Sequence, residues 1–259
     1  FVSGLSNFVF LCGKIGQVNL IIEQGNTSSK VAVYENGKIE AYFVRKRLEL
    51  SFMEEVLREH HCERGILSTV IDRDEELIAF LEKRLCYLLV LDEHVALPIE
   101  VMYKTPATLG RDRLAAVVGA YTLKPACNVL VIDAGTAITY ELLDASGRYL
   151  GGNISPGLTT RFKALNHYTR KLPLVSEPEV VPALGTDTIT AIQAGVVKGI
   201  VYEMDGYIDE MKTQYPDLFV FLTGGHSFYF ERRLKNYIFA DINLVLIGLN
   251  RILEYNVEN

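Results

Sequence analysis

The sequence predicts an α/β protein made of two similar halves that face each other across a cleft. Two observations support this prediction: a strand-turn-strand pattern occurs twice, and alternating helix and strand patterns follow each copy. The chain of 259 residues is long enough for two modest domains, each with its own buried core. We expect an extension over residues 1–18, a first domain over 19–124 and a second domain over 125–259.

The first copy of the repeat runs from Asn19 to Lys38, and the second runs from Asn128 to Arg148. In both, apolar residues lead to an acid, a turn with Gly and Thr follows, and a second strand ends at a glycine turn. Glu23 falls on Asp133, 110 positions further on (133 − 23), and the turn glycines share this offset. A hairpin repeated at such a distance indicates duplication of a whole domain.

Mixed helix and strand patterns follow each hairpin. In the first half, helical and extended patterns alternate over residues 50–60, 65–71, 74–85 and 87–92. In the second half, a long helical pattern, a strand and two further helical patterns occupy 186–215, 218–225, 228–236 and 244–256. Lys124-Pro125 is the expected hinge between the halves. Two such halves face one another in actin-like and sugar-kinase-like folds.

Both hairpin turns combine an acid, a glycine and a threonine, which favours phosphate binding. Backbone N–H groups and Thr hydroxyls, freed from side-chain bulk by Gly, can surround phosphate oxygens. The carboxylates of Glu23 and Asp133 can hold a hydrated Mg²⁺ or another cation that neutralises the phosphates. The turns alone leave open a second interpretation, in which both are ordinary hairpin turns.

The composition excludes several classes of partner. With 26 basic and 32 acidic residues the net charge is −6, and no basic run provides a face for nucleic acid. The apolar patch Phe8–Cys12 is too short to span a membrane, and no basic segment marks a signal peptide. Four cysteines lie far apart without a C-x-x-C pair, so we expect reduced thiols in a cytoplasmic protein.

Several ordered motifs resemble those of type III pantothenate kinases. They are GRDR at 110–113, IDAGTAITY at 132–140, GGNISPG at 151–157, KLP at 171–173, TxxAIxxG at 188–195, TGG at 223–225 and GLN at 248–250. The resemblance covers residues 19–256. It implies phosphorylation of pantothenate by ATP, the first committed step of coenzyme A synthesis. It also implies two ribonuclease-H-like domains and a homodimer whose protomers share the substrate pocket.

The resemblance assigns roles to individual residues. The phosphates of ATP, with their Mg²⁺, are expected to meet Glu23, Gln24, Gly25, Asn26, Thr27, Ser28, Ser29, Lys30 and Thr136. Asp133 matches the ligand of a monovalent cation, K⁺ or NH₄⁺. The pantothenate site is expected to comprise Tyr103, Gly110, Arg111, Asp112, Arg113 and Thr188, with Asp112 as the catalytic base.

Each of these side chains also has a plainer interpretation. Asp112 sits where it could cap the helix that follows, and Thr188 could cap the long helix. Arg113 has the planar fork that a substrate carboxylate favours, but could instead form a surface ion pair. Glu23 stands where the family usually has Asp, which puts metal affinity in doubt. Glu141 is a smaller departure of the same kind.

Two competing functions remain open from the residues. One is another small-molecule kinase of the same fold, because turns that bind ATP phosphates do not define the acceptor. The other is a catalytically silent regulatory homologue, which the departure at Glu23 permits. The chain has neither a G-x-x-x-x-G-K-[ST] loop nor the H-R-D and D-F-G motifs, which argues against P-loop and protein-kinase mechanisms.

Overall fold

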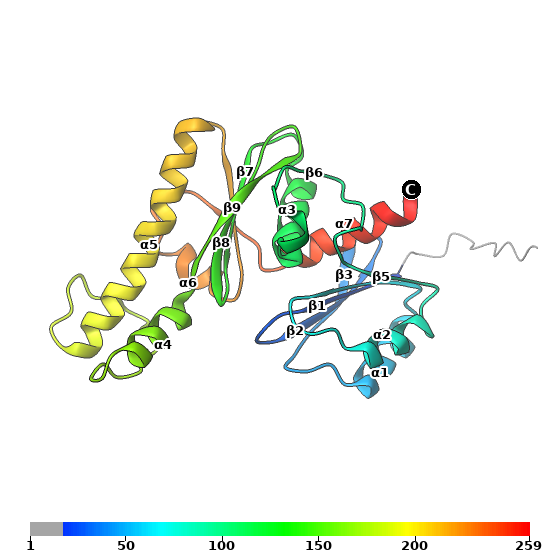
Figure 1. Ribbon diagram of the computed structural model, residues 1–259, viewed down its shortest axis with the longest axis horizontal. Coiled ribbons are helices and arrows are strands. Elements are labelled where there is room, and N and C mark those ends of the chain that lie inside the picture. The colour runs from blue at the N-terminus through cyan, green and yellow to red at the C-terminus, as the bar shows by residue number, and fades with distance from the viewer. Residues whose placement is uncertain (1–17) are drawn as a thin grey trace, which may run out of the picture.

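The computed structural model describes residues 18–259 and contains two mixed sheets with helices around them (Figure 1). The expected extension over residues 1–18 lies outside the described residues, apart from Val18, which begins the first strand. Two helices, α3 (Arg111–Leu123) and α7 (Leu244–Glu258), lie between the sheets, and the long helix α5 (Thr188–Gln214) runs along the far side of the second sheet (Figure 1).

The first sheet has the strand order β3-β2-β1-β4-β5. Its strands are β1 (Val18–Gln24), β2 (Ser29–Glu35), β3 (Lys38–Arg45), β4 (Arg64–Thr69) and β5 (Tyr87–Val90). The first three are antiparallel, whereas β1, β4 and β5 run parallel. One face carries Leu20, Ile22 and Val31, which pack in one buried cluster with α1 (Leu50–His60) and α2 (Glu75–Glu82).

The second sheet repeats this order and adds one strand. Its order is β11-β10-β7-β8-β9-β6, so β9-β8-β7-β10-β11 corresponds to the whole first sheet. Its strands are β6 (Glu100–Val101), β7 (Val129–Ala134), β8 (Ala137–Leu143), β9 (Arg148–Pro156), β10 (Phe219–Thr223) and β11 (Phe239–Ala240). Its outer face packs on α4 (Leu158–Tyr168), α5 (Thr188–Gln214) and α6 (Ser227–Glu231). The prediction of two similar α/β halves is confirmed.

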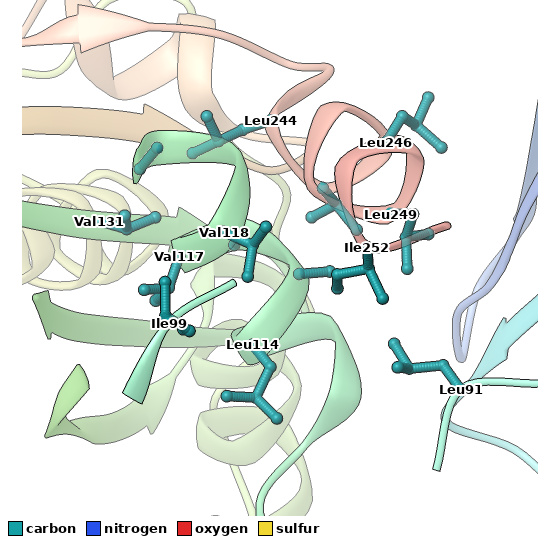
Figure 2. Close-up of a cluster of buried hydrophobic side chains, with 14 of the residues drawn as sticks. Leu91, Ile99, Leu114, Val117, Val118, Val131, Leu244, Leu246, Leu249 and Ile252 are labelled. Atoms are coloured by element: carbon teal, nitrogen blue, oxygen red, sulfur yellow. The ribbon is translucent and has the colours of Figure 1, made fainter. Parts of the chain in front are cut away.

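The core between the sheets is built on α3 (Arg111–Leu123) and α7 (Leu244–Glu258). Figure 2 shows this cluster, in which Leu114, Val117 and Val118 of α3 lie against Leu249 and Ile252 of α7. Strand β6 and a short helix, η1 (Pro106–Thr108), come before α3 in the chain. Strand β6 nevertheless pairs with β9 of the second sheet. The division between residues 124 and 125 therefore stays a prediction, because sheet membership changes earlier in the chain.

The two central helices touch through their backbones. A methyl group at Gly248 would lie 1.7 Å from the carbonyl oxygen of Ala115, and one at Gly119 would lie 2.1 Å from that of Leu244. Only glycine permits so close an approach at these two positions. The contact fixes α3 against α7 and directs the amino end of α3 toward the space between the sheets.

The two hairpins differ by one residue in their turns. Glu23 pairs with Lys30 in the first hairpin, whereas Asp133 pairs with Thr139 in the second. The separations are therefore 7 (30 − 23) and 6 (139 − 133) positions. The constant offset expected from the sequence holds for the leading strands and fails on the returning strands.

Candidate active site

A cavity of about 350 Å³ opens between the sheets where the repeated turns meet. It is lined by the turn after β1, the turn after β7, the residues after β10 and the amino end of α3. All three strands end at this edge, which is where α/β folds bind ligands. Of the sequence-predicted residues, it brings together Glu23, Gly25, Asn26, Thr27, Ser28, Lys30, Asp112, Arg113, Asp133 and Thr136.

The turn after β1 places small polar groups at the cavity. The N–H of Gly25 donates to the carbonyl of Ser28 at 3.0 Å, which closes the turn, while Asn26 and Thr27 are exposed. Gln24 and Ser29 differ from their neighbours because both side chains are buried, at 5% and 3% exposure. These two residues do not line the cavity with the rest of the predicted ATP segment.

Glu23 and Lys30 form an ion pair at the cavity wall. Lys30 Nζ donates to Glu23 Oε2 at 2.8 Å, and the two residues are directly paired across β1 and β2. Burial lowers the pKa of Lys30, but the charge and the hydrogen bond of Glu23 outweigh burial, so this pKa is raised. Lys30 is therefore a positive charge beside the phosphate-binding turn.

Asp133 ends the equivalent strand of the second sheet in a crowded, negative environment. Burial raises the pKa of its carboxyl to about 7, and the charges of Asp112 and Glu23 act in the same direction, against Lys30. A methyl group at Gly224 would lie 2.3 Å from Asp133 Oδ1, so only glycine lets the chain after β10 pass this close to the carboxylate. A carboxylate that lines the cavity, with other carboxylates near it, fits a hard cation.

Asp112 lines the cavity from the first turn of α3. The helix begins at Arg111 and its N-cap is Gly110, so the interpretation of Asp112 as the N-cap is wrong. Its Oδ1 accepts a hydrogen bond from the backbone N–H of Arg113 at 2.8 Å. The carboxylate is thus held at the helix start, where the positive end of the helix dipole stabilises its charge.

The guanidinium of Arg113 is already paired with a carboxylate of the protein. The side chain is 7% exposed, and its Nε and Nη2 donate to the two carboxylate oxygens of Glu141 at 2.6 and 2.9 Å. Nη2 also donates to the hydroxyl of Tyr149 at 3.2 Å. The alternative of a surface ion pair is wrong, since both charged groups are buried, whereas the predicted contact with pantothenate stays a prediction. Tyr103 lies beside this group, its ring centre 5.7 Å from Arg113 Cζ.

Thr188 lies at a different cavity. It is the first residue of α5, but the N-cap is Asp187, whose Oδ1 accepts from the N–H of Thr190 at 2.9 Å. The capping role considered for Thr188 is therefore wrong. Thr188 lines an apolar cavity of about 860 Å³ between α4 and α5, which shares no lining residue with the cavity at Asp112.

Three further predicted substrate residues lie outside the lining of the first cavity. Gly110 and Arg111 precede Asp112, and Arg111 Nη2 lies 3.5 Å from Glu93 Oε2 on the segment between β5 and β6. Tyr103 stacks on Tyr149, with ring centres 6.1 Å apart. The fold thus separates the predicted pantothenate residues into two groups, one at the α3 end and one at α5.

The end of β10 and the residues after it complete the cavity, although no site role was predicted for the TGG motif at 223–225. Thr223, Gly224, Gly225 and His226 line the wall beside Asp133, together with Thr139 of β8. The signal that could have located them is a glycine-containing turn directly after a buried strand, a feature that the two hairpin turns share.

Within residues 18–259, no three His, Cys, Asp or Glu side chains gather in a group that could hold a metal ion. In the same residues, no helix has the length and apolar character needed to cross a membrane.

The chain is similar to one protein family over most of its length. The family model described as type III pantothenate kinase matches residues 19–210. A type III pantothenate kinase of Bacteroides fragilis is 51% identical over 239 residues, which cover 92% of this chain and 98% of the relative. The enzyme of the same name from Phocaeicola vulgatus is 48% identical, with 92% and 99% coverage.

Solved structures support the fold alone. A candidate Baf family transcriptional activator of Campylobacter jejuni superposes with a TM-score of 0.60 at 22% identity, covering 93% of this chain and 100% of that one. A candidate 2-dehydro-3-deoxygalactonokinase of Sinorhizobium meliloti has a TM-score of 0.59 at 13% identity, with 92% and 98% coverage. The likeness to the second places the architecture among sugar-kinase-like folds.

Proposed function

This chain belongs to the type III pantothenate kinase family, and we propose that the cavity between its sheets is where it transfers a phosphoryl group from ATP to pantothenate. The observation that carries the proposal is the meeting of both repeated turns with Asp112 at one cavity. Two turns suited to phosphate and one carboxylate suited to an alcohol are the groups that this reaction requires.

The turn after β1 is the proposed site of the ATP phosphates, with Thr136 of the second turn opposite. Backbone N–H groups of the turn and the hydroxyls of Thr27 and Ser28 supply donors, and Lys30 supplies a positive charge. Mg²⁺ bound with ATP offsets phosphate charge. Glu23 is suited to a contact with that ion through water, since its carboxylate is already paired with Lys30.

Asp112 is the proposed catalytic base. Its carboxylate accepts a hydrogen bond from the hydroxyl of pantothenate, orients that oxygen toward the phosphorus and takes its proton late in a loose transition state. The placement of Asp112 at the cavity, at the start of a helix that is packed rigidly on α7, supports this role. A fixed carboxylate avoids the cost of ordering the base during the reaction.

Asp133 is the proposed ligand of a monovalent cation, K⁺ or NH₄⁺. Its carboxylate lies near those of Glu23, Asp112 and Glu141, so incoming phosphates would add negative charge to a site that is already negative. A bound cation reduces this repulsion. The place of Asp133 in the cavity lining supports the assignment.

A homodimer is the proposed assembly, with each pantothenate site shared between protomers. The support is the separation of Thr188 from Asp112 within one chain. The cavity at Thr188 lies between α4 and α5. Figure 1 shows α5 on the outer side of the second sheet, away from α3. In the proposed dimer, this cavity of one copy meets the amino end of α3 of the other copy. We place this dimer in the cytoplasm, since Cys62, Cys86 and Cys127 are free. The net charge of −6 argues against nucleic acid as a partner, and we propose no membrane partner.

The experiment that tests the proposal is ADP release by the purified chain with MgATP. Release is expected on addition of pantothenate and not on addition of acetate or a hexose. Equal release with a hexose would favour another small-molecule kinase. No turnover in Na⁺, K⁺ or NH₄⁺ buffers would favour a catalytically silent protein.

A further inference from the structure

We propose that Glu141 is a positioning residue for the reaction, which holds the amino end of α3 so that Asp112 faces the cavity. This inference rests on the proposed function, because it acts through Asp112. Glu141 itself does not line the cavity. Its effect passes through two contacts that end at the carboxylate of Asp112.

The first contact is a buried, two-point ion pair between β8 and α3. Glu141 is 0% exposed, and its two oxygens accept from Nε and Nη2 of Arg113. The hydroxyl of Tyr149 on β9 donates to Glu141 Oε2 at 2.6 Å. Two parallel bonds and a third donor fix the plane of the guanidinium as well as its position.

The second contact lies within α3. The backbone N–H of Arg113 donates to Asp112 Oδ1 at 2.8 Å. The residue that Glu141 holds by its side chain is therefore the one that holds Asp112 by its backbone. An unanchored Arg113 would free the first turn of α3, where frayed ends are the least stable part of a helix.

The second sheet is shaped to receive Glu141. A methyl group at Gly152 of β9 would lie 2.3 Å from Glu141 Oε2 and 2.1 Å from the carbonyl oxygen of Tyr140. Gly152 thus leaves the volume that the carboxylate occupies. Burial of a charge pair is costly, and such pairs gain little stability over apolar residues, so a purely structural need does not explain this one.

Arg113 therefore contributes to the site by holding the amino end of α3, and with it Asp112, in place. With Nε and Nη2 committed to Glu141, its fork does not receive a substrate carboxylate in the way expected from its sequence. Tyr103, beside Arg113 and stacked on Tyr149, belongs to the same group of side chains.

The test compares Glu141→Gln with Asp144→Asn. Asp144 is a matched control because it is 7% exposed on the same β8–β9 hairpin, is paired with Arg148 at 2.7 Å and does not line the cavity. For each variant we would measure kcat, the KM of both substrates, the Kd of a non-hydrolysable ATP analogue, and the thermal midpoint.

Glu141→Gln is expected to lower kcat by about 10-fold to 100-fold, the cost of a misplaced catalytic group. The Kd of the ATP analogue should change less than about 2-fold, because Glu141 does not line the cavity and the turn after β1 lies on the other sheet. Asp144→Asn should keep the wild-type kcat. A wild-type kcat for Glu141→Gln, or an equal loss for Asp144→Asn, would overturn the inference.

A double variant shows whether Glu141 acts through Asp112. In an Asp112→Asn background, Glu141→Gln should lower kcat by less than about 3-fold further, because groups that act as a unit are not additive. An undiminished second loss would contradict positioning. If Glu141→Gln does not fold, Tyr149→Phe carries the test, since it removes one hydroxyl and is expected to lower kcat in the same direction.

These results also separate the two proposals. If Asp112→Asn keeps wild-type turnover, the proposed function of Asp112 is wrong. If Asp112→Asn loses turnover while Glu141→Gln and Tyr149→Phe both keep it, only the inference about Glu141 is wrong.

Discussion

Glu23 Oε2 lies 2.8 Å from Lys30 Nζ, across the first hairpin and at the wall of the cavity. The pair is largely shielded, with 14% of the Glu23 side chain and 23% of the Lys30 side chain exposed. Loss of either partner would change the net charge at the cavity wall that an incoming triphosphate meets. The pair therefore links the departure at Glu23 to nucleotide binding rather than to the chemistry of the acceptor.

Lys30→Met is expected to raise the KM for ATP by about 10-fold to 100-fold, because a charge-assisted contact is lost and Glu23 is left unpaired beside the phosphates. The KM for pantothenate should stay within about 2-fold of wild type. Steady-state ADP release checks both values. Lys38→Met on the exposed end of β3 is the matched control. An unchanged KM for ATP would mean that Lys30 does not contact phosphate.

Asp112→Asn is expected to lower kcat by about 10²-fold to 10⁴-fold, the usual contribution of a general base. The amide keeps the shape of the side chain and can still meet the pantothenate hydroxyl, so the Kd for pantothenate should change little. Calorimetric titration with pantothenate and an ATP analogue measures binding apart from turnover. A loss of binding as large as the loss of rate would argue for a binding role instead.

The wild-type initial rate is expected to be higher in K⁺ than in Na⁺ buffer, and Asp133→Asn should remove this difference. The same variant should raise the thermal midpoint of the K⁺-free protein at pH 8, because it removes a charge that burial and neighbouring carboxylates disfavour. Rates in paired chloride buffers and a melting curve provide the two readings. Equal wild-type rates in both buffers would refute the assignment of Asp133.

Mixed dimers of Asp112→Asn and Thr188→Val are expected to recover activity that each variant lacks alone at low pantothenate. If one protomer supplies Asp112 and its partner supplies Thr188, each mixed dimer has one intact site of two, and about half of the wild-type rate. Co-expression with two different tags isolates the mixed dimer. Activity no higher than that of the parent variants would place both residues in one protomer's site.

The two-half architecture could be predicted from sequence because its signal is local. Each hairpin is a continuous pattern that ends in an acid and a glycine turn, and copying a domain copies that pattern. The ion pair between Glu23 and Lys30 could also have been predicted, since it follows from the register of one hairpin. The one-residue difference between the turns was missed because the turn glycines match at a constant offset.

The partner of Arg113 could not be predicted in this way. Glu141 is 28 positions further along the chain, on a strand of the second sheet that α3 meets only in the tertiary structure. Residue type alone favoured a free guanidinium at a substrate site. Similarly, the spacing of motifs along the chain did not reveal that Thr188 and Asp112 line separate cavities.

The close backbone contact between Gly119 and Gly248 fixes the spacing of two helices at a point outside the cavity lining. Helix α3 carries Asp112 at its amino end, and α7 contributes Val245 to the same cavity, so the spacing of the helices sets the width of the opening between the sheets. A methyl group added at either glycine would push the two helices apart. We expect the affinities for the nucleotide and for the alcohol substrate to fall together, although every side chain that contacts them is unchanged.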